Sequence, residues 1–490
     1  MVQGTASHAG KSTVCAGLCR LFADEGFRVA PFKAQNMSLN AAVAHDGGEM
    51  GRAQYTQALA ARTAPSVLMN PILLKPTDTH RSQVIVLGRA TETLAVRDYY
   101  ARRTELWQVV TDSLDTLREQ NDVVIIEGAG SPAEINLAQY DLVNMRVARH
   151  ADAPVLLIGD IERGGVFASL FGTAMLLPAD DRRRIVGFLI NKFRGDASLL
   201  DSGFVTLLAR TGIPTLGVLP WTTIDIAEED SLGINDSPAT DASVLDIAIV
   251  RLPHVSNFDE FAPLAREPGV CVRYVATPEA LAGADLVILP GTRTTMADLA
   301  WVRERGLHRA IAAHRNADRP VLGICGGFQM LGRTVHDPAG VESAPGEMPG
   351  LALLDVDTVF EARKVTESAH ALTGAGAWLG IPSGMTVEGY EIHMGRSTSA
   401  ASPAIHVLES DARAAHDDGA VDDAGLTMGT YLHGLFEGAT FRRGVLQALA
   451  VRRGVALPAA VARPDPFDAM ASLIRAHVQM EPLRRAMGLS

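Results

Sequence analysis

Cys325 stands in a glycine-rich turn that is typical of a catalytic nucleophile. It follows the apolar run 321–324 and lies within Gly323-Ile324-Cys325-Gly326-Gly327, ahead of a stretch with helical character. The spacing matches the elbow in which small neighbours let a strained strand-to-helix turn expose one side chain. A thiolate is the nucleophilic form of cysteine, and a helix start favours an anion. We therefore predict a thiolate nucleophile, with backbone amides of Gly326 and Gly291 stabilising an oxyanion.

A thiol nucleophile needs a base, and His433 is the best-placed one in the sequence. It follows a short apolar strand in Gly429-Thr430-Tyr431-Leu432-His433, so the chain order is cysteine and then histidine. We expect His393, in a different motif, to have a structural or substrate-side role. No carboxylate stands two residues after His433, and Glu437 is within reach by sequence alone. The pattern thus predicts a Cys–His dyad whose third member is not evident.

The amino-terminal residues 4–12, GTASHAGKS, form a variant phosphate-binding loop ahead of a predicted helix. Backbone amides at a helix start face an anion, a lysine adds a mobile positive charge, and a serine hydroxyl can bind magnesium. The usual loop has four residues between its glycines, and this one has five. Only three residues precede it, so we expect its strand to be truncated or to start upstream. The predicted nucleotide-binding residues here are Gly4, Thr5, Gly10, Lys11 and Ser12.

A magnesium–nucleotide site also needs carboxylates at the ends of strands. Glu127 ends the buried run 123–127 beside a glycine-rich turn, where an unpaired carboxylate would be costly. We predict that Glu127 and Ser12 bind the metal. Asp46 and Asp160 are predicted as weaker second ligands, and a turn-forming role for Asp46 and a helix-capping role for Asp160 are the alternatives. Asn191, at the end of another strand, is predicted to hydrogen-bond the nucleotide base.

The elements that must position these residues are alternating strands and helices. Short apolar runs at 123–127, 155–159, 186–191, 286–290 and 321–325 read as strands buried on both faces. Helical stretches lie at 13–24, 51–63, 104–120 and 296–315. This alternation predicts an α/β protein with two doubly wound, mostly parallel sheets.

A domain boundary is visible near residues 222–246, where acidic residues occur without basic ones among Gly, Pro, Ser and Thr. We expect two small-residue stretches, 366–382 and 410–425, to be surface loops. The predicted segments are residues 1–225 (nucleotide and substrate domain), 226–246 (acidic linker), 247–441 (the nucleophile's domain) and 442–490 (carboxy-terminal helical extension).

Composition restricts the class of protein. The 490 residues are 47% apolar and 20% charged, which suits buried cores and excludes a disordered chain. A net charge of −12 argues against nucleic acid or an anionic membrane as the main partner. The four cysteines contain no Cys-x-x-Cys pair, and neither a signal peptide nor a spanning run is evident. We expect a cytoplasmic protein, and a homo-oligomer is compatible with the sequence.

At this point the motifs resemble those of the cobyric acid synthase family. The resemblance runs through nearly the whole chain. Its motifs are PFKAQNMSLN (31–40), GRAQ (51–54), MNPILLKP (69–76), EGAGSPAEINL (127–137), DLVNM (141–145), GDIERGGVFASL (159–170), GFLINKFRGD (187–196), GICGGFQMLG, GYEIHMGR and YLHGLFE.

The resemblance implies a glutamine-dependent enzyme that uses ATP and Mg²⁺. Its substrate would be adenosylcobyrinic acid a,c-diamide, amidated at the b, d, e and g carboxylates. The first half would resemble dethiobiotin synthetase, and the second a flavodoxin-like class I glutaminase without the usual Glu. His8 stands where the family usually has Asp, so we expect magnesium binding to differ there. Asp141, Asn144 and Arg163 are the predicted corrinoid contacts.

Three alternatives remain open from the sequence. An amidotransferase of the same design could act on another carboxylate, such as a cell-wall isoglutamate or the a,c positions of the corrin. A partitioning ATPase uses a similar loop, but it typically has a second lysine there and has no use for a glutaminase half. A non-catalytic paralogue is suggested only by the short first strand and His8.

Overall fold

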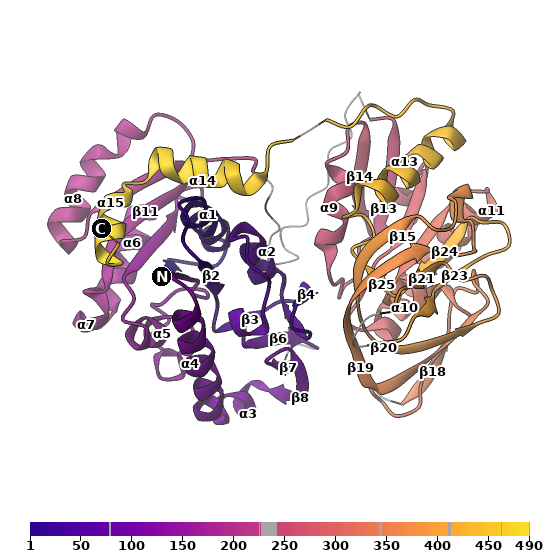
Figure 1. Cartoon of the computed structure of the whole chain (residues 1–490), viewed down its shortest axis with the longest axis horizontal. Helices are drawn as coiled ribbons and strands as arrows, with labels where there is room; N and C mark the ends of the chain where they lie inside the picture. Colours follow the sequence, from indigo (N-terminus) through magenta and orange to yellow (C-terminus); the bar gives the residue numbers. More distant parts are fainter. Residues whose placement is uncertain are drawn as a thin grey trace. The chain divides into compact units, whose positions relative to one another are not determined.

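The chain folds into two compact units, each built around its own sheet (Figure 1). The structure, a computed structural model, describes all residues except 78–79, 225, 227–242, 343–344, 410–412, 462 and 490. Most of the predicted linker therefore lies outside the described residues. The first unit comprises Met1–Ser38, Ala44–Glu229 and Arg463–Ser490, and the second comprises Leu39–Val43 and Asp230–Ala462.

A parallel sheet forms the centre of the first unit. Its strands are β1 (Val2–Gly4), β2 (Val29–Phe32), β9 (Val123–Ile126), β10 (Val155–Asp160), β11 (Ile185–Phe193) and β12 (Thr215–Pro220). The order β1-β10-β11-β12 is parallel throughout, and β2 pairs in parallel with β9. A parallel bridge from Val2 to Glu127 places the end of β9 beside β1. The phosphate-loop residues thus leave the carboxyl edge of the sheet next to Glu127.

Helices cover this sheet because its strands are apolar on both faces. The three strands and three helices predicted in this unit are present, with shifted ends. The helices are α1 (Lys11–Asp24), α2 (Arg52–Ala60), α3 (Val96–Ala101), α4 (Arg103–Gln120), α5 (Met145–His150), α6 (Val166–Leu176), α7 (Ala179–Arg182), α8 (Asp201–Thr211), α14 (Pro466–His477) and α15 (Met480–Ala486), with 3-10 turns η1 (Val67–Met69), η2 (Ala138–Tyr140) and η3 (Ala197–Leu200).

The carboxy-terminal segment covers the helix that follows the phosphate loop. Met470 and Ile474 of α14 are buried against α1, and a Cβ added to Gly17 would lie within 2.7 Å of both. Arg20 of α1 pairs with Asp465 at 3.2 Å. α13 (Ala439–Arg453) is instead part of the second unit, so residues 442–490 are divided between the two units.

A small second sheet in the first unit was not predicted. Its strands are β3 (Gln35–Met37), β6 (Ile72–Pro76), β7 (Arg81–Val86) and β8 (Arg89–Ala95), and β5 (Glu49–Gly51) lies in the same unit. β3 and β6 are parallel, and the other neighbours are antiparallel. The motif that begins at Pro31 therefore crosses from the central sheet into this smaller one.

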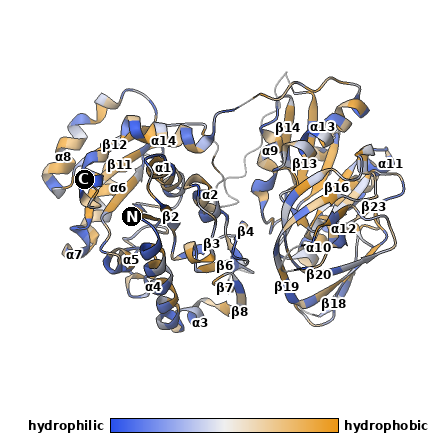
Figure 2. Cartoon of the chain, viewed as in Figure 1, coloured by the Kyte–Doolittle hydropathy of each residue, from blue (hydrophilic) through white to orange (hydrophobic). Residues whose placement is uncertain are grey.

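The second unit also has a mostly parallel sheet at its centre, and its strands are among the most apolar segments in Figure 2. The order is β14 (Val270–Val275), β13 (Leu245–Val250), β15 (Leu286–Leu289), β16 (Val321–Ile324), β24 (Thr427–Thr430) and β23 (Ala420–Val421). Only β23 is antiparallel to its neighbour. The other elements around it are η5 (Phe258–Phe261), α9 (Ala262–Ala265), η6 (Glu279–Leu281), α10 (Thr295–Glu304), α11 (Leu307–Asn316), α12 (Gly326–Leu331) and α13. This arrangement confirms the predicted fold class.

The predicted helix at 296–315 is two helices. α10 ends at Glu304 and α11 begins at Leu307, with Gly306 between them at φ 73°. A left-handed residue interrupts an α-helix, and glycine adopts that conformation at little cost.

The loop prediction at 366–382 is wrong for residues 366–373, which lie in the long strand β19. The loop prediction at 410–425 is wrong for 416–418 and 420–421, which form β22 and β23, and its residues 410–412 lie outside the described residues. β23 pairs with β24 in the parallel sheet, whereas β19, β22 and their neighbours form a second sheet whose small, alternating side chains hid the strand period. Its strands are β17 (Thr334–Asp337), β18 (Gly346–Pro349), β19 (Val356–Thr373), β20 (Thr386–Ser399), β21 (Ile405–Val407), β22 (His416–Asp418) and β25 (Leu432–His433), and η7 (Trp378–Gly380) follows β19.

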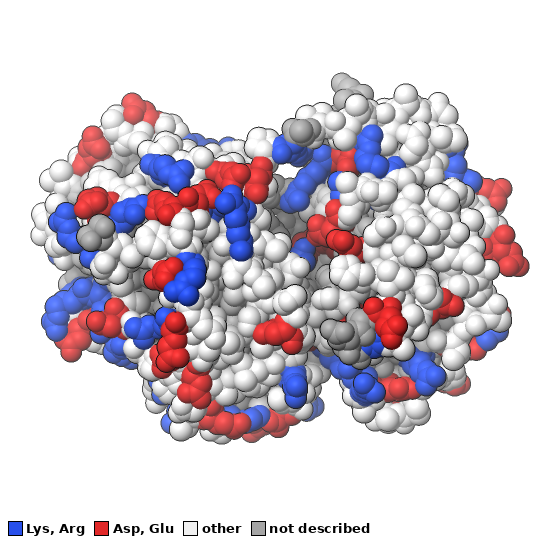
Figure 3. Space-filling model, in the orientation of Figure 1, with Lys and Arg blue, Asp and Glu red and all other residues white. Residues whose placement is uncertain are grey.

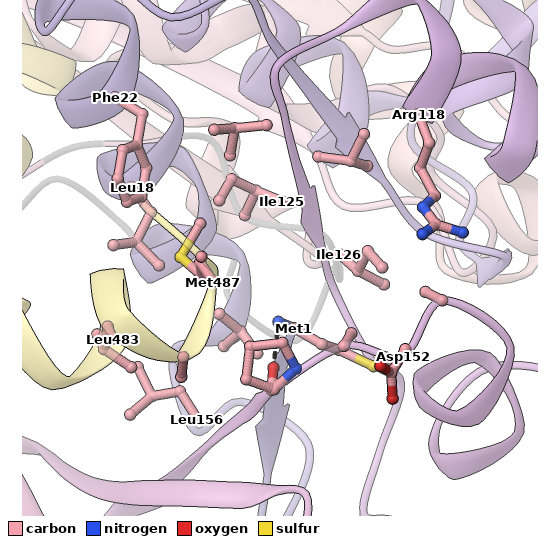
Figure 4. Close-up of a pocket in the computed structure, with 18 of the residues that line it drawn as sticks. Met1, Leu18, Phe22, Arg118, Ile125, Ile126, Asp152, Leu156, Leu483 and Met487 are labelled. Carbon is pink, nitrogen blue, oxygen red and sulfur yellow. Dashed lines mark hydrogen bonds between the residues drawn. The ribbon is translucent and has the colours of Figure 1, made fainter. Parts of the chain in front are cut away.

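A cavity of about 530 Å³ lies in the first unit, at the edge of the sheet opposite the phosphate loop (Figure 4). Ile125 of β9 and Leu156 of β10 line it together with Met1, which precedes β1, and Leu483 and Met487 line it from the carboxy-terminal segment. The residues predicted to do chemistry do not line this cavity. It is therefore separate from both predicted sites.

On the face drawn in Figure 3, acidic and basic side chains are interspersed in both units. No helix among the described residues is long and apolar enough to cross a membrane.

Candidate functional site

Cys325 occupies a strained turn between β16 and α12. Its backbone has φ 51° and ψ −107°, an uncommon conformation for a residue with a side chain. A Cβ on Gly327 would collide with the carbonyl oxygen of Leu289, and one on Gly323 would lie 2.7 Å from the carbonyl oxygen of Gly327. Small neighbours are therefore required by close backbone packing. The Cys325 amide donates to the carbonyl of Thr430 at 2.8 Å, which ties the turn to β24.

His433 of β25 hydrogen-bonds to Cys325. Its Nδ1 lies 3.1 Å and 3.3 Å from the carboxylate oxygens of Glu260, which is 2% exposed. Since Nδ1 faces Glu260, Nε2 remains for the cysteine. The Glu260 carboxylate also accepts a hydrogen bond from the Gly434 amide at 3.1 Å. Cys325, His433 and Glu260 thus form a nucleophile–base–orienting carboxylate arrangement.

The electrostatics of this group favour the protonated imidazole. Burial by itself lowers the pKa of His433, but the Glu260 carboxylate and the hydrogen bond with Cys325 outweigh it and raise the pKa to about 10. A buried imidazolium between a carboxylate and a cysteine side chain can donate its proton to a group that reacts at the sulfur. The site can therefore attack an amide carbon with sulfur and supply a proton to the leaving nitrogen.

Glu260 was missed by the sequence analysis, and Glu437 is not its substitute. Glu437 is exposed, whereas Glu260 lies in η5, far from His433 in sequence. The sequence from Asn257 to Glu260 gave no catalytic signal. The carboxylate that orients the histidine was expected within a few residues after His433, and Glu260 lies far before it in the sequence. Only the fold brings these residues together.

The other residues predicted around the nucleophile are close to it. Gly326 is the first residue of α12, and a Cβ on Gly291 would lie 2.7 Å from Cε1 of His433. Both amides therefore belong to the immediate surroundings of the pair. His393 is a packed residue: its ring stacks on Tyr431 at 3.9 Å between centroids, and Nδ1 hydrogen-bonds to the Gly395 carbonyl at 2.8 Å.

In the first unit, the phosphate loop is closed by contacts of its own lysine. Lys11 Nζ donates to the carbonyls of Ala6 at 3.0 Å and Gly130 at 3.2 Å. Gly10 caps α1 with φ 96°. The Thr5 amide donates to Ile158 of β10 at 2.9 Å, and a Cβ on Gly4 would lie 3.2 Å from the Lys11 side chain. The five predicted loop residues are thus held together at the start of α1.

Glu127 is the centre of a buried polar cluster behind this loop. Its Oε1 accepts hydrogen bonds from Ser12 Oγ at 2.8 Å and Lys33 Nζ at 2.9 Å, and its Oε2 accepts one from Gln57 Nε2 at 2.5 Å. Glu127 is fully buried and the Lys33 side chain is 3% exposed. Lys33 and Gln57 were not predicted as site residues, although Lys33 lies within the PFKAQNMSLN motif and Gln57 follows the GRAQ motif.

The charge of Glu127 is stabilised by these partners. Burial by itself raises the pKa of the carboxyl group, but the Lys33 ammonium and the hydrogen bonds from Lys33, Gln57 and Ser12 outweigh it, so the pKa lies below its ordinary value. Glu127 is therefore an anion at neutral pH in a site that adjoins the phosphate loop.

The donor set fits a magnesium ion that arrives with nucleotide phosphates. Mg²⁺ usually keeps several waters and takes one or two protein oxygens besides phosphate. Ser12 Oγ and Glu127 Oε1 lie 2.8 Å apart and offer such a pair. Among the described residues there is no group of three or more His, Cys, Asp or Glu that could hold a metal on its own.

The remaining predicted residues have structural contacts in the first unit. Asp46 accepts a hydrogen bond at 2.6 Å from Oγ of Ser66, the N-cap residue of η1, and its part in a magnesium site stays a prediction. Asn191 Nδ2 donates to the carbonyl of Ala9 at 2.9 Å and supports the phosphate loop. Asp160 pairs with Lys192 at 3.0 Å.

The predicted corrinoid contacts lie beyond the end of β9. Asn144 holds the turn after Glu127 by donating to the Ala129 carbonyl at 2.7 Å and accepting from the Ala129 amide at 3.2 Å. Asp141 caps α5 by accepting from the amides of Asn144 and Arg146 at 2.8 Å and 2.9 Å. Arg163 is exposed in the turn after β10.

Comparison with known proteins finds two families that match successive parts of the chain. Residues 1–232 match the CobQ/CobB/MinD/ParA nucleotide binding domain family, and residues 246–441 match the CobB/CobQ-like glutamine amidotransferase domain family. The chain is 51% identical to a cobyric acid synthase of Sorangium cellulosum, over 100% of this chain and 98% of the relative. It is 47% identical to those of Citrobacter koseri and Chloroflexus aurantiacus, in each case over 99% of this chain and 98% of the relative.

Proposed function

The chain belongs to the cobyric acid synthase family, and we propose that it amidates the b, d, e and g carboxylates of adenosylcobyrinic acid a,c-diamide with ATP and glutamine-derived ammonia. It is an enzyme, a glutamine amidotransferase of the ligase type. The observation that carries the proposal is the buried Cys325–His433–Glu260 arrangement in one unit, with the phosphate loop and Glu127 in the other.

Amide formation in water requires an activated acid. The carboxylate of the substrate attacks the γ-phosphorus of ATP, the bond to the bridging oxygen breaks, and an acyl phosphate and ADP result. Lys11 and the loop amides at the start of α1 bind and orient the phosphates and neutralise their charge. Such charge stabilisation contributes several kcal/mol in a site that excludes water.

Ser12 and Glu127 are the residues that would hold Mg²⁺ with the nucleotide. The bound ion supplies charge neutralisation on the phosphate oxygens. Lys33 and Gln57 keep Glu127 ionised and fix its orientation toward Ser12. His8 offers no carboxylate to this site, in contrast to the aspartate that the family pattern has there.

The second unit would generate the ammonia. The Cys325 thiolate attacks the side-chain amide carbon of glutamine, and the amides of Gly326 and Gly291 stabilise the oxyanion. His433 gives its proton to the leaving ammonia, and Glu260 holds the ring with Nε2 toward the reaction. Water then releases glutamate from the thioester, and the ammonia displaces phosphate from the acyl phosphate.

Asp141, Asn144 and Arg163 are proposed to contact the corrinoid near the phosphate loop. Asn144 shapes the turn after Glu127, and Arg163 presents an exposed positive charge after β10, which suits a substrate that carries several carboxylates. Since the reacting acid must reach the γ-phosphate, contacts beside β9 and β10 are the appropriate ones.

Replacing Cys325 with Ala tests whether the second unit supplies the ammonia while the first unit activates the acid. Glutamine-driven amidation should vanish, while ammonium salts should still support it, because only the source of ammonia is removed. Cys271→Ala, a buried thiol on β14 of the same unit, is the matched control and should retain glutamine use. Mass spectrometry of the a,c-diamide after reaction counts the amidations. Retained glutamine use by Cys325→Ala would refute the assignment.

A further inference from the structure

A short segment of the amino-terminal half contributes to the second unit. Leu39–Val43 belongs to that unit, whereas Met1–Ser38 and Ala44 onward belong to the first. Two hydrogen bonds anchor the segment: the Ala41 amide donates to Asn257 Oδ1 at 3.0 Å, and the Phe258 amide donates to Asn40 Oδ1 at 3.1 Å. Asn40 is 0% exposed and Asn257 is 2% exposed. The pair of asparagines therefore forms a buried, reciprocal connection.

The receiving turn is the one that leads to Glu260. Asn257 has φ 53° and ψ 36°, and it is the residue from which η5 starts. Asparagine is among the few residues besides glycine that adopt this left-handed conformation readily. Its carbonyl accepts a hydrogen bond from the Glu260 amide at 3.1 Å. The conformation at Asn257 thus sets where the Glu260 backbone lies.

Both ends of this turn are fixed by buried contacts. The Asn40 side chain holds the Phe258 amide on one side, and the Glu260 carboxylate holds His433 Nδ1 and the Gly434 amide on the other. Without the Asn40 side-chain oxygen, the buried Phe258 amide would lose this hydrogen-bond acceptor. The backbone would then shift to satisfy the amide, and the start of η5 would move with it. A shift of the Glu260 carboxylate would then alter the orientation of the imidazole.

We propose that Asn40 is a positioning residue of the glutaminase site, which acts through the Asn257–Glu260 turn on His433. The inference rests on the proposed function. Asn40 touches neither the substrate nor Cys325, so its effect is on the geometry and protonation of the base. The segment that carries the last residue of the PFKAQNMSLN motif is then required for glutamine hydrolysis, in addition to the acid-activating half in which the motif begins.

The experiment compares Asn40→Ala with Asn40→Asp in the full chain. Ala removes the acceptor for the Phe258 amide, and Asp keeps an oxygen in the same place. We expect Asn40→Ala to lower kcat for glutamine hydrolysis by about 10-fold to 100-fold, the effect of a misplacement of about 1 Å, while the KM for glutamine changes little. Asn40→Asp should recover most of the rate. Asn257→Gly, which keeps the left-handed turn but removes the acceptor for Ala41, should give an intermediate loss.

The pH dependence separates positioning from a general loss of structure. In Asn40→Ala, the upper limb of the pH profile of glutamine hydrolysis should shift to lower pH, because a displaced Glu260 no longer keeps the pKa of His433 raised. Amidation driven by ammonium salts should stay at the wild-type rate. The proposal is overturned if Asn40→Ala keeps the wild-type kcat and profile, or if ammonium-driven amidation falls with it. A wild-type chain that fails to hydrolyse glutamine would instead refute the proposed function.

Discussion

Glu260 is the residue that turns a cysteine–histidine pair into an oriented, charged unit. It is buried, it faces Nδ1 of His433, and it also holds the Gly434 amide. A carboxylate in this position selects the tautomer with Nε2 toward the sulfur and stabilises the imidazolium. The base is therefore set up by a residue from another part of the chain.

Glu260→Gln removes the charge but keeps the size and one of the two accepting oxygens. We expect kcat for glutamine hydrolysis to fall by at least about 10²-fold, because the imidazolium is no longer stabilised. The pKa of His433, about 10 in the wild type, should move down toward its ordinary value of 6.5. An NMR titration of the His433 ring measures the shift, and ammonium-driven amidation serves as the control. An unchanged titration would contradict the assignment.

Glu260→Gln should also change how the free energy of unfolding depends on pH. A raised folded-state pKa means that the folded chain binds the His433 proton more tightly than the unfolded chain. The contribution of the ion pair is fully present below pH 6.5 and is lost as the pH rises through about 10. The wild type should therefore exceed Glu260→Gln in free energy of unfolding at neutral pH, and the gap should close above pH 10. Urea unfolding at several pH values checks this.

Lys33 and Glu127 form a buried ion pair, so removing either partner alone should lower the free energy of unfolding. Lys33→Met leaves an uncompensated carboxylate, and we expect the free energy of unfolding of the first unit to fall by about 3–5 kcal/mol. The double variant Lys33→Met/Glu127→Gln should recover most of this loss, since it removes the buried charge altogether. Denaturant unfolding measures both. Equal stabilities of the single and double variants would contradict the pairing.

At the residue scale, the sequence predicts groups with strong local context and misses partners from distant segments. Cys325 and Lys11 lie in glycine-rich turns. The function of such turns can be predicted from the sequence, because close backbone packing requires glycine beside the functional residue. Glu260, Lys33 and Gln57 have no such context. Their roles come from side-chain contacts made across the fold, and a single sequence does not encode those contacts locally.

At the scale of elements, the turn that starts α1 depends on the backbone conformation of Gly10. Gly10 has φ 96°, and a Cβ there would collide with the Asn191 side chain. Gly10→Ala should therefore cost about 1–2 kcal/mol in backbone strain and raise the KM for ATP. Gly172→Ala is the matched control: it lies within α6, where a Cβ meets nothing within 4 Å, so it should be neutral or stabilising by about 0.5–1 kcal/mol. Equal KM values for ATP in the two variants would contradict a special role for Gly10.

The elements that the sequence predicted correctly are those with continuous apolar runs. β9, β10, β11, β15 and β16 are each buried on both faces, and such strands leave a clear signal. β19 left none, because its alternation uses Ala, Ser, Thr and His rather than large apolar residues. Composition therefore suggested a loop where pairing with β20 makes a long strand. The second sheet of the second unit was missed for this reason.

At the scale of the whole chain, the first and last segments belong to one unit. Arg463–Ser490 folds with the amino-terminal residues, and the second unit is formed by the chain in between together with Leu39–Val43. The helical extension predicted from residue 442 has a uniform composition, so its division between the two units could not be seen in the sequence. The division matters because α14 covers the helix that carries Lys11 and Ser12.

Removing residues 463–490 should therefore damage acid activation and spare glutamine hydrolysis. The truncation uncovers the α1 surface around Gly17, against which Met470 and Ile474 pack, and each such side chain contributes about 1.5–3 kcal/mol by burial. We expect ammonium-driven amidation and ATP hydrolysis to be lost, while the Cys325 site continues to release glutamate. Ile474→Ala in the full-length chain is the milder variant, with an expected loss of about 2–5 kcal/mol in the unfolding of the first unit. If the truncated chain hydrolysed ATP at the wild-type rate, α14 would not be needed to support the phosphate loop.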